Sequence, residues 1–257
     1  MSNYHTPVLL EHTVNYLNVR KDRKYIDATL GGGGHSALIR SQGGMVLGID
    51  QDQDAIDNSK EFADIVVKSN FVHLEEIAAT YNWFPVSGVL LDLGMSMHQI
   101  VDSKRGFSFQ ADGPLDMRMD TNLSNTAADL INHLSFNHLT KIFKDFGEIP
   151  EAKVLAKKII DNRPLETTGQ LAQLCGKRSQ QAFQALRIAV NDELGALTQV
   201  IPQIKNILEV GGRAVFISFH SLEDRIVKNE FENWGLSLTK KPIQGERGSK
   251  LRAFEKI

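Results

Sequence analysis

Short apolar runs alternate with helical patterns through the first ninety residues, and this alternation limits the folds open to the chain. The expected strands are residues 24–27, 45–50, 65–68 and 88–92, and the helices expected between them are residues 35–42, 54–62 and 75–81. The strands are rich in Val, Ile and Leu without polar alternation, which is typical of strands covered by helices on both sheet faces. The alternation therefore predicts an α/β fold whose parallel strands are joined by right-handed crossovers.

The alternation stops after Asp92. Residues 93–120 are rich in Gly, Asp and Met and show no clear period, and loops of this length in compact domains are usually functional. Residues 124–209 read as almost entirely helical. Within them, Thr167 and Gln170 form a capping-box pattern ahead of an expected helix. This region predicts a helical insertion.

The sheet pattern resumes near the end of the chain. Gly195 and Pro202 are expected to break or kink the preceding helical region. The elements expected after it are a strand at residues 213–218, a helix at 221–234, and a basic, β-prone tail at 236–241 and 250–254. We therefore expect one α/β domain, residues 1–103 and 193–257, interrupted by an all-helical domain, residues 104–192.

Composition narrows the functional classes. A single cysteine, Cys175, excludes an internal disulfide or a cysteine-based zinc site and suits a reducing cytoplasm, and its apolar surroundings indicate a core residue. No apolar run reaches the ~20 residues of a membrane helix. Residues 141–191 and 225–257 carry an excess of basic side chains, which suits a polyanionic partner but is also typical of solvated helix faces. The oligomeric state, monomer or homodimer, stays open.

Four consecutive glycines, residues 31–34, follow the first expected strand and precede a helix. Such turns bind both dinucleotides and adenosyl cofactors, because glycine lets a ligand approach the backbone. The dinucleotide pattern G-x-G-x-x-G fails at its sixth position, which is Ser36. In addition, Asp27 at the strand end would repel a pyrophosphate and attract a sulfonium or amino group. These features favour S-adenosylmethionine over a nicotinamide dinucleotide, whose oxidoreductases remain an alternative.

Two further strands also end in acids. Asp50 lies about 20 residues beyond the glycine turn, where a carboxylate binds the ribose hydroxyls of adenosine in several cofactor classes. Asp92 ends the fourth strand. Because strands of an open α/β sheet bind ligands at their carboxyl ends, we expect Asp27, Asp50 and Asp92 to line one site. Phe71, beyond the third strand, is a candidate for stacking on adenine, although a lone Phe is more often a core residue.

Longer motifs extend this interpretation. They are residues 5–8 (HTPV), 27–36 (DATLGGGGHS), 48–52 (GIDQD), 90–94 (LLDLG), 105–109 (RGFSF), 112–120 (DGPLDMRMD), 183–188 (FQALRI) and 217–228 (ISFHSLEDRIVK). In these motifs the chain resembles the bacterial 16S ribosomal RNA cytosine-N4 methyltransferases, the MraW or RsmH family. The resemblance implies a class I, Rossmann-like methyltransferase sheet with an inserted helical domain that recognises substrate. It also implies S-adenosylmethionine as cofactor and methylation of the exocyclic N4 amine of a cytosine in the decoding region, within the small subunit or a late assembly intermediate.

The resemblance also assigns residues. The cofactor residues it implies are Gly33, Gly34, His35, Asp50, Phe71, Asp92 and Gln99, to which the glycine turn itself adds Asp27 and Gly31. The chain departs from the family in three stretches: residues 96–99 (SMHQ), 176–182 and 246–252. The last two are stretches that we expect to touch RNA.

The cytosine N4 nitrogen is a poor nucleophile because its lone pair is delocalised into the ring. A polar acceptor that pulls on an N–H would favour the reactive, pyramidal geometry and later help to remove the proton. Asp92 and Ser96 are the catalytic candidates. The candidate substrate residues are Phe107, Phe109, Asp116, Arg118, Arg187, His220 and Ser221, with Lys153, Lys157 and Lys158 as possible phosphate contacts. His220 fits a structural role nearly as well. No His, Asp or Glu grouping has metal-ligand spacing, so no metal is expected. A non-catalytic RNA-binding assembly factor is the other alternative.

Overall fold

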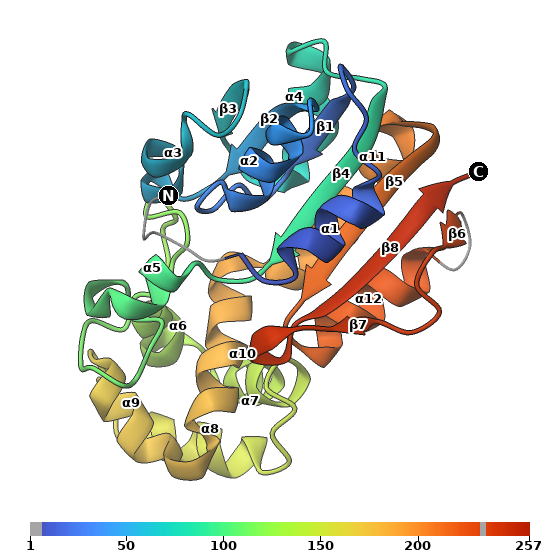
Figure 1. Cartoon of the computed structure of the whole chain (residues 1–257). Coiled ribbons are helices and arrows are strands. Elements are labelled where there is room, and N and C mark those ends of the chain that lie inside the picture. Colours follow the sequence, from blue (N-terminus) through green and yellow to red (C-terminus); the bar gives the residue numbers. More distant parts are fainter. Residues whose placement is uncertain (1–6, 232–234) are drawn as a thin grey trace. The chain divides into compact units, whose positions relative to one another are not determined.

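The computed structural model describes residues 7–231 and 235–257 (Figure 1). The chain forms two compact units, one made of Met1–Ser96 and Leu194–Ile257 and the other of Met97–Glu193. The sequence led us to expect the divisions at 103/104 and 192/193. The first division comes earlier because α5 (Met97–Val101) contacts the single turn at Ser103–Arg105, so that both belong to the helical unit.

The first unit is built on one mixed sheet. Its strands are β1 (Lys24–Asp27), β2 (Met45–Asp50), β3 (Ile65–Lys68), β4 (Val86–Leu93), β5 (Leu208–Ser218), β6 (Gly235–Ser237), β7 (Ile243–Gln244) and β8 (Lys250–Lys256). The strand order is β3-β2-β1-β4-β5-β8-β6, with β7 also paired to β8. Strands β1 to β5 are parallel, and β8 runs antiparallel to its neighbours. The predicted class I, Rossmann-like sheet is confirmed.

Helices of this unit pack on both sheet faces. They are α1 (Leu10–Leu17), α2 (Gly34–Ser41), α3 (Gln53–Ser59), α4 (Leu74–Thr80), α11 (Glu193–Ile207) and α12 (Ser221–Phe231). One core cluster joins α4, α11 and α12 to one face, and a second joins α1 and α2 to the other. Neighbouring strand residues such as Leu90 and Leu91 enter opposite clusters, and both are fully buried. The two-faced burial explains why the strands lack polar alternation.

Several predicted boundaries were wrong. Gly195 and Pro202 both lie inside α11, which continues through them. A proline inside a helix costs one backbone hydrogen bond. Pro202 is exposed, whereas the opposite face of α11 is buried. The packing of that buried face stabilises the helix more than the proline destabilises it. Of the β-prone stretch expected at 236–241, only the start is a strand, β6, and a further short strand, β7, follows beyond it at Ile243–Gln244. The helix expected at 221–234 is described as far as Phe231, and residues 232–234 lie outside the described residues.

The second unit is helical. Its remaining helices are α6 (Ala127–His133), α7 (Phe136–Asp145), α8 (Ala152–Asp161), α9 (Thr168–Cys175) and α10 (Ser179–Asn191). The predicted capping box of Thr167 and Gln170 is confirmed at the start of α9. Across the described part of both units, no helix combines the length and apolar character that crossing a membrane requires.

The stretch before α6 has little regular secondary structure and is held in place by hydrogen bonds from side chains to backbone groups. The Asn191 amide accepts a hydrogen bond from the Met119 N–H at 2.7 Å and donates one to the Met117 carbonyl at 2.8 Å. The Arg105 guanidinium donates to the carbonyls of Arg118 and Met119. These contacts satisfy backbone groups that a helix or strand would otherwise pair, and they hold Met117 at a φ of 64°.

Candidate active site

Three neighbouring strands of the first unit carry an aspartate at or next to their carboxyl end. Asp27 ends β1, Asp50 ends β2, and Asp92 lies one residue before the end of β4. Because β1 pairs in parallel with both β2 and β4, the three acids lie at the same edge of the sheet. We call this end of the sheet the carboxyl edge.

The glycine turn connects β1 to α2 along this edge. Gly31 and Gly33 adopt positive φ values of 48° and 73°. A Cβ atom at Gly33 would lie 2.5 Å from the Phe62 ring, so both conformation and space require glycine there. His35 is buried and its Nε2 lies 3.2 Å from the Val8 carbonyl oxygen. The His35 side chain thus contacts the N-terminal segment, while α2 begins with backbone N–H groups that lack helical partners.

Asp27 is buried within the turn, with 1% of its surface exposed. Its carboxylate accepts hydrogen bonds from the Ser36 hydroxyl at 2.7 Å and the Thr29 N–H at 3.3 Å. Burial raises the pKa of Asp27 to about 6, although both hydrogen bonds lower it. The carboxylate therefore ties the end of β1 to the first turn of α2.

Asp50 holds the turn from the neighbouring strand. One carboxylate oxygen accepts the Gly31 N–H at 2.8 Å, and the other accepts the Asp52 N–H at 2.9 Å. Burial raises the pKa of Asp50 to about 6. Each oxygen keeps a second lone pair for a ligand hydroxyl. Asp52 caps α3 through the Asp54 N–H, as expected for acids at a helix start.

Phe71 begins the single 3-10 turn Phe71–His73 directly after β3. Its ring is half-buried and packs against the core cluster of α4 and α11. The structure therefore gives Phe71 a core contact and leaves the residue partly exposed.

Asp92 differs from the other two acids. Its Oδ1 atom is buried and has no hydrogen-bond partner among the described residues. Burial, together with the charges of Asp27 and Glu223, raises the pKa of Asp92 to about 8, whereas the charge of Arg247 lowers it. A buried carboxylate oxygen without a partner is rare in folded proteins and is typical of functional sites.

The backbone around Asp92 is tightly fixed. The Asp92 N–H donates to the Thr29 hydroxyl at 2.6 Å, and the Gly94 N–H donates to the Asp92 carbonyl at 2.8 Å. A Cβ atom at Gly94 would lie 2.6 Å from the Phe219 ring, which packs against this turn. Ser96 is partly exposed two residues further on and ends the first segment of the unit.

The first turn of α12, which follows β5, adds a residue that the sequence did not reveal, Glu223. It is 2% exposed, and its Oε2 accepts the N–H groups of Phe219 at 2.8 Å and His220 at 3.3 Å. Its Oε1 lies 3.1 Å from His220 Nε2. The spacing of Glu223 three residues after His220 resembles a capping box and could have signalled this role. His220 thus takes part in the start of α12, while Ser221 is exposed in its first turn.

The remaining candidates belong to the helical unit, and several of their polar groups are engaged there. The Arg118 guanidinium forms a two-bond ion pair with Asp116, at 2.7 and 2.8 Å. Arg187 forms the same arrangement with Glu193, at 2.7 and 2.9 Å. These arginines therefore order the unit, and neither guanidinium is a free platform for a base. Gln99 is buried in α5.

The two phenylalanine candidates differ in accessibility. Phe107 is 7% exposed, and the Arg105 guanidinium lies 5.9 Å from its ring centre. Phe109 is 43% exposed and packs edge-on against Phe183 at 5.0 Å. Phe109 is thus the aromatic side chain of this pair that a ligand can reach.

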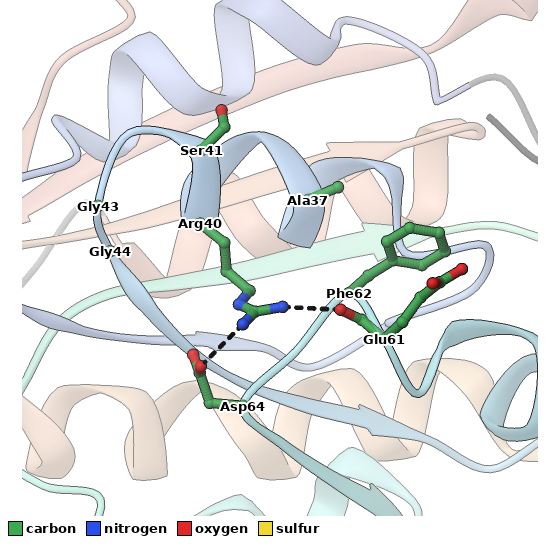
Figure 2. A pocket seen from close by; sticks show the side chains of 8 residues that line it. All are labelled: Ala37, Arg40, Ser41, Gly43, Gly44, Glu61, Phe62 and Asp64. Carbon is green, nitrogen blue, oxygen red and sulfur yellow. Dashed lines mark hydrogen bonds and ion pairs between the residues drawn. The ribbon is translucent and has the colours of Figure 1, made fainter.

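A cavity of about 480 Å³ lies elsewhere in the first unit (Figure 2). It is lined by Ala37, Arg40, Ser41, Gly43, Gly44, Glu61, Phe62 and Asp64. Arg40 crosses it, donating to the Glu61 carbonyl at 2.7 Å and lying 3.2 Å from the Asp64 carboxylate. Because Gly44 and Asp64 directly precede β2 and β3, this cavity is at the amino ends of the strands, opposite the carboxyl edge.

Comparisons with known proteins show what this chain is similar to. The model of the MraW methylase family matches residues 2–243. The chain is 42% identical to Ribosomal RNA small subunit methyltransferase H of Clostridioides difficile, over 91% of this chain and 83% of that protein. It is 43% identical to the protein of the same name from Cytophaga hutchinsonii, over 88% and 82% of the two chains. A crystal structure of a putative rRNA methylase from Clostridium thermocellum aligns with a TM-score of 0.50 at 15% identity, covering 98% of this chain and 99% of that one. That alignment supports the fold.

Proposed function

Because the chain belongs to the MraW methylase family, we propose that it methylates the N4 amine of a cytosine in the decoding region of 16S ribosomal RNA, with S-adenosylmethionine as donor. The coarser activity, methylation of small-subunit ribosomal RNA, follows from relatives at 41–43% identity that carry that name. We also propose a cytoplasmic location, because the proposed substrate is ribosomal RNA. The finer assignment depends mainly on one observation, the unpartnered oxygen of Asp92 at the carboxyl edge.

The residues of the carboxyl edge fit this cofactor. The start of α2 offers backbone N–H groups to a ligand carboxylate. Asp50 has lone pairs left for ribose hydroxyls, and Phe71 is a partly exposed residue that could stack on adenine. Acids near a bound cation favour it by charge, and the same acids disfavour a pyrophosphate. This is our reason for preferring the sulfonium cofactor over a nicotinamide dinucleotide.

In the proposed reaction Asp92 accepts a hydrogen bond from the N4 amine and then its proton. When bound, S-adenosylmethionine supplies an electrophilic methyl group on a sulfonium. Alignment of the amine with that group can contribute about 7–11 kcal/mol. A base whose pKa lies near the working pH is an efficient proton acceptor, and a pKa of about 8 meets this condition. A cation bound nearby lowers this raised pKa, which favours the ionised form of Asp92 at neutral pH.

The helical unit is the proposed substrate-recognition domain. The target cytosine must leave any stack, at a cost of a few kcal/mol, and an accessible ring such as that of Phe109 can hold a splayed base. The exposed lysines of α8, including Lys153, are candidate phosphate contacts. The substrate would be the RNA within the small subunit or a late assembly intermediate.

A tritiated-methyl transfer assay tests the proposal. The protein is incubated with labelled S-adenosylmethionine and either small subunits that lack the modification or free 16S RNA, and the product is identified by nucleoside analysis. We expect N4-methylcytidine, and an Asp92→Asn variant that is slower by about 10²–10⁴-fold. An Asp57→Asn control removes an exposed acid on α3 and should leave the rate unchanged. Cofactor binding without transfer to any ribosomal particle would favour the alternative, a non-catalytic RNA-binding assembly factor.

A further inference from the structure

The turn between β7 and β8 lies beside the carboxyl edge. β8 runs antiparallel to β5, with Lys250 paired to Ser218, so β8 begins where β5 ends. Ser218 is in turn paired with Leu93 of β4, the residue after Asp92. The turn that precedes Lys250 therefore reaches the same edge of the sheet as the three aspartates.

This turn is held in one conformation by its own hydrogen bonds and by packing. The Ser249 N–H and hydroxyl both donate to the Glu246 carbonyl, at 3.0 and 2.7 Å, and the Gly245 N–H donates to the Ser249 carbonyl at 2.9 Å. A Cβ atom at Gly245 would lie 2.5 Å from Leu9 Cγ, so the turn packs closely on the N-terminal segment. Arg247, at its centre, has a φ of 56° and a ψ of 24°, the left-handed region that non-glycine residues rarely adopt.

The Arg247 side chain is exposed and forms no hydrogen bond or ion pair with any other residue that the structure describes. Other arginines near β8 are engaged: Arg252 pairs with Asp224 at 2.6 Å, and Arg213 pairs with Glu255 at 3.0 Å. The guanidinium of Arg247 is nevertheless close enough to the carboxyl edge that its charge acts on Asp92. Arg247 is therefore a cation beside the site that no partner within the described residues neutralises.

A charge conflict at the edge explains the need for such a cation. Asp27, Asp50, Asp92 and Glu223 gather carboxylates where an RNA backbone has to approach, and like charges at close range repel. Guanidinium is well suited to phosphate, because its planar donors match two phosphate oxygens. We propose that Arg247 binds a backbone phosphate of the RNA next to the target nucleotide and so positions the substrate at the carboxyl edge. This inference rests on the proposed function and extends it to a residue outside the helical unit.

Two substitutions separate charge from backbone conformation. Arg247→Gly removes the charge while glycine adopts the left-handed conformation without strain, and Arg247→Lys keeps the charge. Lys21→Ala is the matched control, because Lys21 is an exposed cation before β1, at the opposite edge of the sheet. For each variant, RNA binding is measured between 50 and 200 mM salt, S-adenosylmethionine binding by calorimetry, and KM and kcat by methyl transfer.

Arg247→Gly should weaken RNA binding by about eightfold near 0.1 M salt and reduce the salt slope by about one, as expected for one phosphate contact. KM for the RNA should rise similarly, cofactor affinity should stay unchanged, and Arg247→Lys should restore most of the loss. An unchanged salt slope in Arg247→Gly, or an equal loss in Lys21→Ala, would overturn the proposal. A loss of cofactor affinity alone would assign Arg247 to the cofactor and also overturn it. If the wild type transfers no methyl group, the proposed function fails, whereas the salt dependence of RNA binding still tests Arg247.

Discussion

Replacing Asp92 with asparagine removes one ionisable group from the carboxyl edge while keeping the size and shape of the side chain. In the folded protein, burial and the charges of Asp27 and Glu223 raise the pKa of Asp92 to about 8. In the unfolded chain the pKa is about 4. The folded state therefore holds this proton more tightly than the unfolded state, so Asp92 lowers the free energy of unfolding increasingly as the pH rises from about 4 to about 8.

The size of the effect follows from the shift. Each pH unit between the two pKa values costs about 1.4 kcal/mol, which gives about 4 kcal/mol at pH 7. Asparagine removes this cost but leaves its amide N–H groups without a partner, at about 1–3 kcal/mol. We therefore expect Asp92→Asn to be more stable than the wild type by about 1–3 kcal/mol at pH 7. For a chain of this length that is a rise in Tm of roughly 3–10 °C.

Thermal unfolding of the ligand-free protein at pH 5, 7 and 8.5 measures this difference. The gain should be largest at pH 8.5 and should shrink toward zero at pH 5, while methyl transfer is impaired throughout. Asp57→Asn provides the opposite control: the Lys60 ion pair lowers the pKa of Asp57, so its loss should slightly destabilise the protein at neutral pH. If Asp92→Asn raised the free energy of unfolding equally at every pH, or not at all at pH 8.5, the result would show that Asp92 is not a buried, unpaired carboxylate.

Three further substitutions test the neighbouring parts of the site and the helical unit. Asp50→Ala should weaken S-adenosylmethionine binding by about tenfold to a hundredfold in calorimetry, because it removes an acceptor for ribose and releases the Gly31 turn; unchanged affinity would contradict the ribose assignment. Gly33→Ala, which meets both a positive φ and the Phe62 ring, should lower the free energy of unfolding by about 1–3 kcal/mol in thermal melts. Replacing Lys157 and Lys158 with Gln should reduce the salt slope of RNA binding by about one to two, and an unaltered slope would place the RNA surface elsewhere.

The fold was predictable from sequence where burial alone determines local structure. The strands β1, β2 and β3 begin and end where the apolar runs do, and in β1 and β2 most residues are buried, which explains the apolar runs without polar alternation. The continuity of α11 was not predictable, since Pro202 signals a break and only the packing of the opposite face overrides it. The ordered conformation of residues 102–126 was also not predictable. It depends on hydrogen bonds between the side chains of Arg105 and Asn191 and backbone groups distant in the sequence.

The positions of the acids in the site could be predicted from the sequence, but their surroundings could not. Strand ends place Asp27, Asp50 and Asp92 together in any parallel sheet of this order. Their different surroundings depend on tertiary contacts: Ser36 engages Asp27, the Gly31 N–H engages Asp50, and Asp92 Oδ1 is left without a partner. Glu223 was missed because an acid three residues into a helix reads as an ordinary cap.

The unpaired carboxylate and the unpaired guanidinium are best understood together. A buried carboxyl group without a hydrogen-bond partner lowers stability, and a non-glycine residue in a left-handed turn adds backbone strain, so neither group stabilises the folded protein by itself. The Asp92 carboxylate and the Arg247 guanidinium are each stabilised when a ligand of opposite charge binds next to them. A sulfonium beside Asp92 and a phosphate beside Arg247 would each neutralise one group, and the two ligands would then attract each other across the edge. The methyl donor and the RNA are therefore expected to bind with positive coupling, with Asp92 and Arg247 as the groups that each ligand neutralises.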